Sequence, residues 1–146
     1  MFKKTGFRLL GLVVLFSFLF IAQAQTEEQG WKKTITLPSG EVVCDLNGEW
    51  DVLWQGRGEL AWFGRIKNVI KITQQGNSFE GIRMIETQYN TKGSVAINGE
   101  LDKNGFKKLF YNSGDLSGEY KGKISKDGNK IEFEPNTSFY FELTRK

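Results

Sequence analysis

At the start of the expected domain the chain reads Leu46-Asn47-Gly48-Glu49-Trp50-Asp51-Val52-Leu53-Trp54-Gln55. Successive side chains of a β-strand point to opposite faces, so Trp50, Val52 and Trp54 share one face of such a strand. The opposite face carries Asp51, Leu53 and Gln55, of which two are polar. The alternation predicts a strand whose aromatic face points into a protein core.

Seven further runs of alternating polarity follow, at intervals of roughly ten residues. Glycine, asparagine and aspartate separate them, and these residues form the tight turns that connect antiparallel strands. Closing such a sheet into a barrel hides its unpaired edges. We therefore expect an all-β fold, a single antiparallel up-and-down eight-stranded β-barrel. The expected strands are 47–55, 66–74, 78–86, 94–101, 106–112, 118–125, 129–134 and 138–144.

The two ends of this barrel are expected to meet. In a closed antiparallel barrel the first and last strands are neighbours, and the end of one lies beside the start of the other. We therefore expect the Arg145 guanidinium to lie on the Trp50 indole, a cation–π contact worth about 0.5–2 kcal/mol. Four side chains share the inward face of the last strand: Phe139, Phe141, Leu143 and Arg145.

These residues also carry a family resemblance. Gly48-x-Trp50 at the start of the first strand, with Arg145 at the end of the last, resembles the structural signature of the lipocalin-like (calycin) barrels. The resemblance spans residues 46–145, and it implies a barrel that holds a small apolar molecule. A second motif is similar to a turn of small bacterial lipocalin-like domains: Ile72-x-Gln74-x-Gly76-Asn77-x-Phe79-x-Gly81.

The connection between the first two strands is unusually apolar, because it contains Leu60-Ala61-Trp62-Phe63. In lipocalin-like barrels the corresponding loop partly covers the open end. Exposed apolar patches are typical of binding surfaces, so Trp62 and Phe63 are the first candidates for contact with a ligand or partner. The alternative is a loop that packs its own side chains and only closes the barrel.

Arg83 is a further candidate, and its role depends on which face of its strand is interior. We favour the interior for the face that carries Arg83, because that choice leaves Glu80 and Glu86 in water. Arg83 is then a buried cation suited to a ligand carboxylate. On the opposite choice it is a surface charge.

The expected interior is either a ligand cavity or a packed core. Tyr120, Phe133 and Phe141 lie on successive inward faces and line the cavity on the first choice, whereas close packing favours the second. Glycines inside strands often mark bulges or close backbone approaches, and here they leave gaps that favour a cavity. These glycines are Gly81, Gly99 and Gly122.

Charge and residue types exclude several functions. Three of the 20 Lys and Arg residues lie in residues 1–24, and the rest of the chain carries 17 basic and 17 acidic residues. This balance provides no field for a nucleic-acid partner. The chain has no His, no nucleophile motif and no metal-ligand cluster. We therefore expect no enzyme, no catalytic residue, no metal and no cofactor.

Residues 1–24 read as a secretory signal peptide, with a basic start, an apolar run and the cleavage pattern Ala22-Gln23-Ala24. The apolar run from Leu9 to Ile21 is too short to cross a bilayer as a helix, so no membrane span is expected after cleavage. The protein is therefore expected to be periplasmic or secreted.

The remaining chain divides into an N-terminal extension, residues 25–45, and the lipocalin-like β-barrel, residues 46–146. The extension adds a short strand around residues 34–37 or plugs one barrel end. Cys44 is the only cysteine and is expected to be a small buried hydrophobe.

Two functions follow from these features. The first is binding of a small apolar or amphipathic ligand without catalysis, with a small hydrophobic molecule as partner. The alternative is a packed barrel that acts through its surface, as a protein-interaction or inhibitor module with a protein partner.

Overall fold

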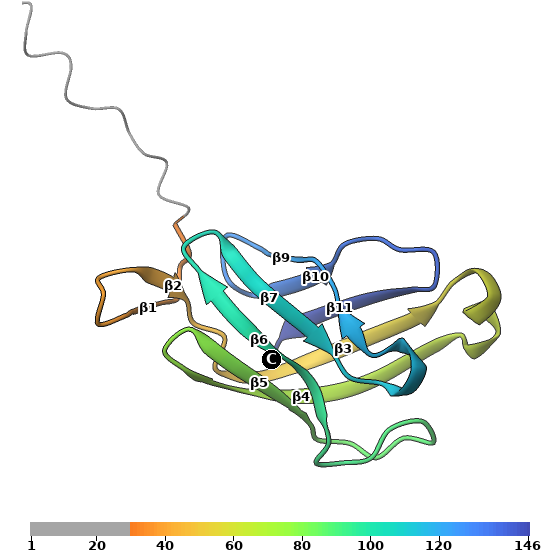
Figure 1. The fold of residues 1–146 in the computed structure, drawn as a ribbon. Coiled ribbons are helices and arrows are strands. Elements are labelled where there is room, and N and C mark those ends of the chain that lie inside the picture. The colour runs from red at the N-terminus through yellow and green to blue at the C-terminus, as the bar shows by residue number, and fades with distance from the viewer. Residues whose placement is uncertain (1–29) are drawn as a thin grey trace, which may run out of the picture.

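The computed structural model describes residues 30–146, which form an all-β fold (Figure 1). The expected signal peptide, residues 1–24, lies outside the described residues. Two 3-10 helices, η1 (Gly58–Phe63) and η2 (Gly114–Leu116), interrupt the strands. The strands are β1 (Thr34–Thr36), β2 (Val42–Cys44), β3 (Gly48–Gly56), β4 (Arg65–Gln75), β5 (Ser78–Arg83), β6 (Val95–Asp102), β7 (Gly105–Tyr111), β8 (Gly118–Glu119), β9 (Gly122–Ile124), β10 (Lys130–Phe133) and β11 (Phe139–Arg145).

Nine strands form one curled antiparallel sheet, in the order β8-β7-β6-β5-β4-β3-β11-β10-β9. Apart from β3 and β11, every pair of neighbouring strands is close in sequence, as an up-and-down arrangement requires. Strands β3 and β11 lie side by side, and Arg145 pairs with Trp50. The prediction that the first and last strands of the domain are neighbours is therefore confirmed.

The prediction of a closed barrel of eight strands was wrong in two respects: the sheet has nine strands, and it is curled but not closed, with β8 and β9 as its two edges. Seven of the expected strands correspond each to one strand of the sheet, but the expected strand 118–125 is split into β8 and β9. Before the break the segment pairs with β7, and the Tyr120 N–H donates to the Leu109 carbonyl at 2.9 Å. After the break it pairs with β10, and the Glu134 N–H donates to the Lys121 carbonyl at 2.8 Å. Because the chain changes partner at Tyr120-Lys121, neither pairing continues through one whole strand.

The interior follows the alternation that the sequence predicts. Trp50, Val52 and Trp54 are buried, while Asp51 between them is exposed. Aromatic rings fill the part of the interior enclosed by β7, the β8–β9 segment, β10 and β11, and neighbouring ring centroids lie 4.5 to 6.1 Å apart. This spacing is that of attractive aromatic pairs, so this part of the interior is a packed core. Its rings are those of Tyr111, Tyr120, Phe133, Phe139 and Phe141.

The β1–β2 hairpin lies at one end of the sheet, at the left of Figure 1. A short strand was expected around residues 34–37, and β1 confirms it. Val43, Cys44 and Leu46 are fully buried, and the Gln74 side chain donates to the Cys44 carbonyl at 3.0 Å and accepts from the Leu46 N–H at 2.8 Å. The segment therefore also packs across this end. Burial raises the pKa of the Cys44 thiol to about 11, as expected of a buried, unreactive cysteine.

Arg145 stabilises the same end of the sheet through its side-chain contacts. Its guanidinium carbon lies 4.4 Å from the centroid of the Trp50 ring, which confirms the predicted contact. The guanidinium also donates to the carbonyls of Asp45, Asn47 and Gly128, at 2.7, 2.7 and 2.9 Å. One side chain thus joins the extension, the start of β3, the turn before β10 and the end of β11.

No helix in the described part of the chain has the length and hydropathy of a membrane span.

Candidate functional site

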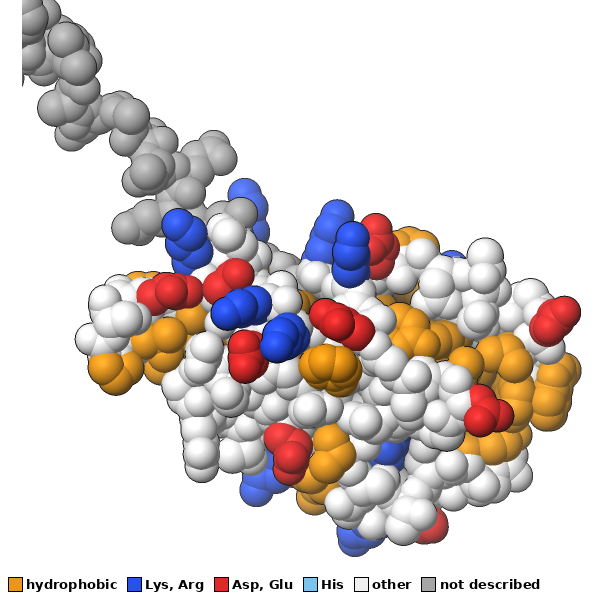
Figure 2. Space-filling view, viewed as in Figure 1, with side chains coloured by type: hydrophobic (Ala, Val, Ile, Leu, Met, Phe, Trp, Pro, Cys, Tyr) orange, Lys and Arg blue, Asp and Glu red, His pale blue; other side chains and the backbone are white. Residues whose placement is uncertain are grey.

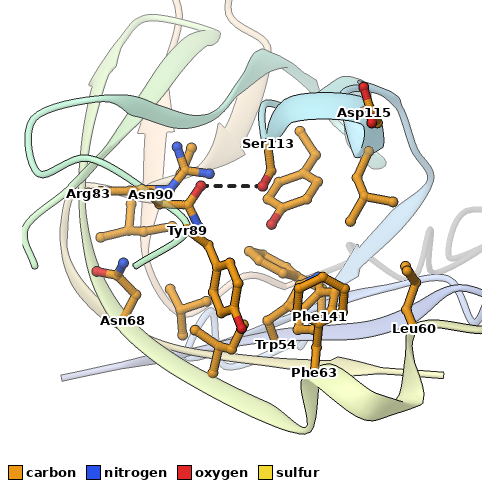
Figure 3. A pocket seen from close by; sticks show the side chains of 16 residues that line it. Trp54, Leu60, Phe63, Asn68, Arg83, Tyr89, Asn90, Ser113, Asp115 and Phe141 are labelled. Carbon is orange, nitrogen blue, oxygen red and sulfur yellow. Dashed lines mark hydrogen bonds between the residues drawn. The ribbon is translucent and has the colours of Figure 1, made fainter. Parts of the chain in front are cut away.

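The structure contains a cavity of about 270 Å³ at the end of the sheet away from the β1–β2 hairpin (Figure 3). Inward side chains of the long strands form its walls, and the connections β3–β4, β5–β6 and β7–β8 surround its mouth. The residues that line it are Val52, Trp54, Leu60, Phe63, Ile66, Asn68, Ile70, Arg83, Tyr89, Asn90, Ala96, Tyr111, Ser113, Asp115, Leu116 and Phe141.

The walls of the cavity are mainly apolar because strand alternation directs apolar side chains inward. Val52 and Trp54 come from β3, and Ile66 and Ile70 from β4. Ala96 on β6 is buried and lines the cavity, and its side chain is smaller than most of the other buried side chains. Part of the space therefore remains unfilled. Apolar walls with a few polar groups are typical of small-molecule sites.

Arg83 is the buried cation of this cavity. It is only 5% exposed, which confirms the interior placement that its strand pattern favours. Its guanidinium donates to the Ser94 hydroxyl at 3.1 Å, to the Val95 carbonyl at 2.9 Å and to the Asn112 carbonyl. Within residues 30–146 no carboxylate forms an ion pair with Arg83. Burial lowers the pKa of Arg83, although an arginine remains charged near neutral pH.

A tyrosine lies beside this cation. Tyr111 on β7 lines the cavity and is 4% exposed. Burial raises the pKa of its phenol, while Ser113 and Arg83 oppose that shift. The hydroxyl of Tyr111 is therefore protonated near neutral pH and remains a donor in the cavity.

Two connections meet beside the mouth of the cavity. The Ser113 hydroxyl donates to the Asn90 side-chain oxygen at 3.3 Å, which links the β7–β8 and β5–β6 connections (Figure 3). Tyr89 lies next to Asn90, and its ring contacts Phe63 edge to face at a centroid distance of 5.1 Å. These contacts join all three connections around the mouth through side chains.

Helix η1 places its apolar residues in two environments. Leu60 and Phe63 pack partly buried against the core and line the cavity, and Phe63 contacts Trp54 edge to face at 5.9 Å. Trp62 is 74% exposed and stacks on Phe63 at 3.7 Å. Figure 2 shows hydrophobic side chains gathered at the end of the molecule that carries η1. The expected loop thus both covers the cavity and presents an apolar surface.

The structure brings together three of the six predicted binding residues. Phe63, Arg83 and Phe141 line the cavity. Trp62 lies outside it, on the surface. Tyr120 and Phe133 belong to the packed aromatic part of the interior, and the Tyr120 hydroxyl donates to the Leu116 carbonyl at 2.6 Å. The interior is therefore packed on one side and hollow at one end, which combines the two alternatives that the sequence leaves open.

The glycines inside the strands do not create the cavity, contrary to expectation. A Cβ on Gly81 would lie 2.7 Å from Ile70 and 2.8 Å from Ile97, so these side chains already fill the gap. A Cβ on Gly122 would lie 2.8 Å from Leu109, and one on Gly99 only 2.0 Å from the Lys108 carbonyl. These glycines permit close approach of neighbouring groups and do not line the cavity.

Sequence reasoning missed most of the cavity wall. Trp54 and Val52 could have been found, because they share the inward face of the first strand with Trp50. Tyr89, Asn90 and Ser113 carry no such signal, because they lie in connections without periodicity. Within residues 30–146 no group of three or more Cys, Asp or Glu residues is arranged to hold a metal ion.

The comparisons with known proteins provide no relative: no protein-family model, no curated protein and no solved structure matches the chain.

Proposed function

We propose that the protein binds a small apolar or amphipathic molecule in the cavity at the η1 end and does not transform it. The cavity itself carries this proposal: about 270 Å³ of space with mainly apolar walls and one buried cation. Burial of a ligand's apolar surface contributes about 25 cal/mol per Å², so even a compact ligand gains useful affinity there. Arg83 or Tyr111 then orients its polar end.

The fold supports the same reading. Counted as one interrupted strand, the segment 118–124 gives an eight-stranded arrangement, and Trp50 lies against Arg145 as in the lipocalin-like resemblance. We therefore propose that the protein is a lipocalin-like barrel and that it reaches the periplasm or the cell exterior after cleavage behind Ala24. A mature N-terminus at Gln25, found by sequencing protein from its host, is the expected result; a retained Met1 contradicts this placement.

A neutral apolar dye, N-phenyl-1-naphthylamine, tests the binding proposal. Its fluorescence should rise on binding to the protein, and Ala96→Phe should remove that rise because the new ring fills the cavity. Val95→Phe is the matched control: it adds the same ring at the neighbouring position, which does not line the cavity, and should leave dye binding unchanged. Equal binding by all three proteins, or by none, contradicts the proposal.

Native mass spectrometry of protein purified from its host provides a direct measurement. A retained molecule of small mass is the expected result, and Ala96→Phe should lack it. Its identity would then define the ligand class.

The second candidate function is a surface role as a protein-interaction or inhibitor module. Trp62 favours it, because a Trp exposed to 74% of its surface, beside the 44% exposed Tyr89, is an apolar patch of the kind that partners contact. A Trp62→Ala variant that loses binding to a partner protein, but keeps dye binding, would favour this function.

A further inference from the structure

The cavity contains hydrogen-bond donors that the protein does not fully use. Tyr111 lines the cavity beside Arg83, and its protonated hydroxyl remains a donor there. Arg83 has five N–H donors, and protein oxygens accept three hydrogen bonds from it. An unpaired buried donor costs about 1–3 kcal/mol, so native structures rarely keep one without a partner such as water or a ligand.

The side-chain amide oxygens in the same wall are already engaged. The Asn68 side-chain oxygen accepts from the Val69 N–H at 2.7 Å, and the Asn90 side-chain oxygen accepts from Ser113 at 3.3 Å. Asp115 provides the one carboxylate of the lining, and it lies exposed on η2, well apart from Arg83 in Figure 3. The polar capacity left in the cavity is therefore that of donors around a buried positive charge.

A positive charge in an apolar cavity selects its ligand by charge. A buried ion is stable when an opposite charge and hydrogen bonds compensate for lost water. A ligand carboxylate supplies both, because its oxygens accept charge-assisted hydrogen bonds from a guanidinium. A neutral ligand supplies only the hydrogen bonds, and a cationic ligand is repelled.

The volume of the cavity limits the size of the ligand. A cavity of about 150 Å³ accommodates a benzene ring. The present cavity of about 270 Å³ therefore has room for one ring with a head group, or for two fused rings. Trp54 and Phe63 provide aromatic surface against which such a planar ring can pack.

We propose that the cavity takes a compact cyclic carboxylate: Arg83 binds the anionic head, an oxygen of the ligand accepts a hydrogen bond from the Tyr111 hydroxyl, and the ring packs against the apolar walls. This inference rests on the proposed binding function and narrows it to one chemical class. It separates the site from one for long-chain lipids, whose tails need more enclosed volume than this end of the fold provides.

Isothermal titration with three probes tests the inference: 2-naphthoate, naphthalene-2-methanol and hexadecanoate. The first two share a ring system and differ in charge, so their ratio of affinities measures the effect of the carboxylate. We expect 2-naphthoate to bind at least about tenfold more tightly than the alcohol, as one charge-assisted hydrogen bond suffices to produce. Hexadecanoate should bind more weakly than 2-naphthoate.

Three variants assign the effect to residues. Arg83→Met should bring the acid-to-alcohol ratio close to one. Tyr111→Phe keeps the aromatic ring but removes the hydroxyl, and should weaken 2-naphthoate about fivefold while leaving a preference for the acid. Tyr140→Phe is the control, because that hydroxyl bonds to Glu142 and its residue lies outside the cavity lining; its affinities should equal those of the unchanged protein.

The outcomes distinguish this inference from the proposed function. Equal affinity for acid and alcohol, a ratio unaffected by Arg83→Met, or tighter binding of hexadecanoate overturns the compact carboxylate and leaves the binding function standing. If neither naphthalene compound nor the neutral dye binds, both the binding function and the compact carboxylate are contradicted. If Arg83→Met does not fold, Tyr111→Phe decides: unchanged binding of 2-naphthoate then overturns the inference.

Discussion

Two arginines at opposite ends of the sheet have similar partners and different surroundings. Arg145 donates to three backbone carbonyls and lies on the Trp50 ring, at the end that the β1–β2 hairpin covers. Arg83 donates to two carbonyls and a hydroxyl, but it faces a cavity. The hairpin end is therefore a packed junction, whereas at the η1 end a buried cation faces open space, which under our proposal makes it available to a ligand.

The largest expected effect is that of Arg145→Met. The substitution leaves the carbonyls of Asp45, Asn47 and Gly128 without their donor and removes the cation from Trp50, so the free energy of unfolding should fall by about 3 kcal/mol. Arg83→Met, in the unliganded protein, should cost about half as much, because it also relieves the desolvation of a buried charge. Urea unfolding followed by tryptophan fluorescence measures both; a larger loss from Arg83→Met would reverse the comparison.

The next effect is that of Gly48→Ala. Gly48 has a φ of +129° beneath the Arg145 guanidinium, a conformation that residues with a Cβ rarely adopt. The substitution should lower the free energy of unfolding by roughly 2 kcal/mol. Gly64, after η1, has a φ of +68° and a ψ of −138°, also a conformation that residues with a Cβ rarely adopt, but it has open space around it, so Gly64→Ala should cost about 1 kcal/mol. Thermal unfolding of the two variants provides the measurement, and equal costs would argue against a strained hairpin end.

The contribution of Cys44 to the free energy of unfolding depends on pH. Burial raises its pKa from 9.0 to about 11, so the folded state holds the proton more tightly than the unfolded chain. The corresponding stability is fully present below pH 9 and is lost as the pH rises from 9 to 11. Between these pH values the unchanged protein should lose about 2 kcal/mol more than Cys44→Ala. Parallel curves for the two proteins would show that the thiol is not buried in solution.

The smallest effect on stability is expected at the surface of the η1 end. Trp62→Ala should change the free energy of unfolding by less than about 0.5 kcal/mol, because the side chain is 74% exposed. Phe63→Ala, one residue further, should cost about 2 kcal/mol because that ring packs against Trp54. Chemical denaturation of the pair tests whether η1 has one packed and one free aromatic residue.

The strand positions and the contact at the β1–β2 hairpin end of the fold could be predicted from the sequence, because period-two alternation and strand order depend on local pattern. The Trp50–Arg145 contact followed from parity and neighbouring strands, and the inward direction of Arg83 from the placement of two glutamates. The break at Tyr120-Lys121 could not be predicted, since it arises where one segment pairs with two different strands.

The cavity was harder to predict than the fold. Its mouth depends on how three connections without periodicity meet, as Tyr89 against Phe63 and Ser113 with Asn90 show. Its hollow part depends on volume: Ala96 is small where Phe133 and Tyr120, elsewhere in the interior, are large and fill their space. Parity identifies inward residues, but it does not say which of them leave room.

Arg145 is far in sequence from the carbonyls to which it donates, and this separation has a consequence for folding during synthesis. Its partners at Asn47 and Asp45 are 98 and 100 positions earlier, so that contact cannot form until nearly the whole domain has been made. Until then the edge of β3 that pairs with β11 is unpaired, and an unpaired strand edge can pair with another chain. The contact between the Arg145 guanidinium and the Trp50 indole forms only when β11 pairs with that edge, so it belongs to the last step in the closure of the first and last long strands.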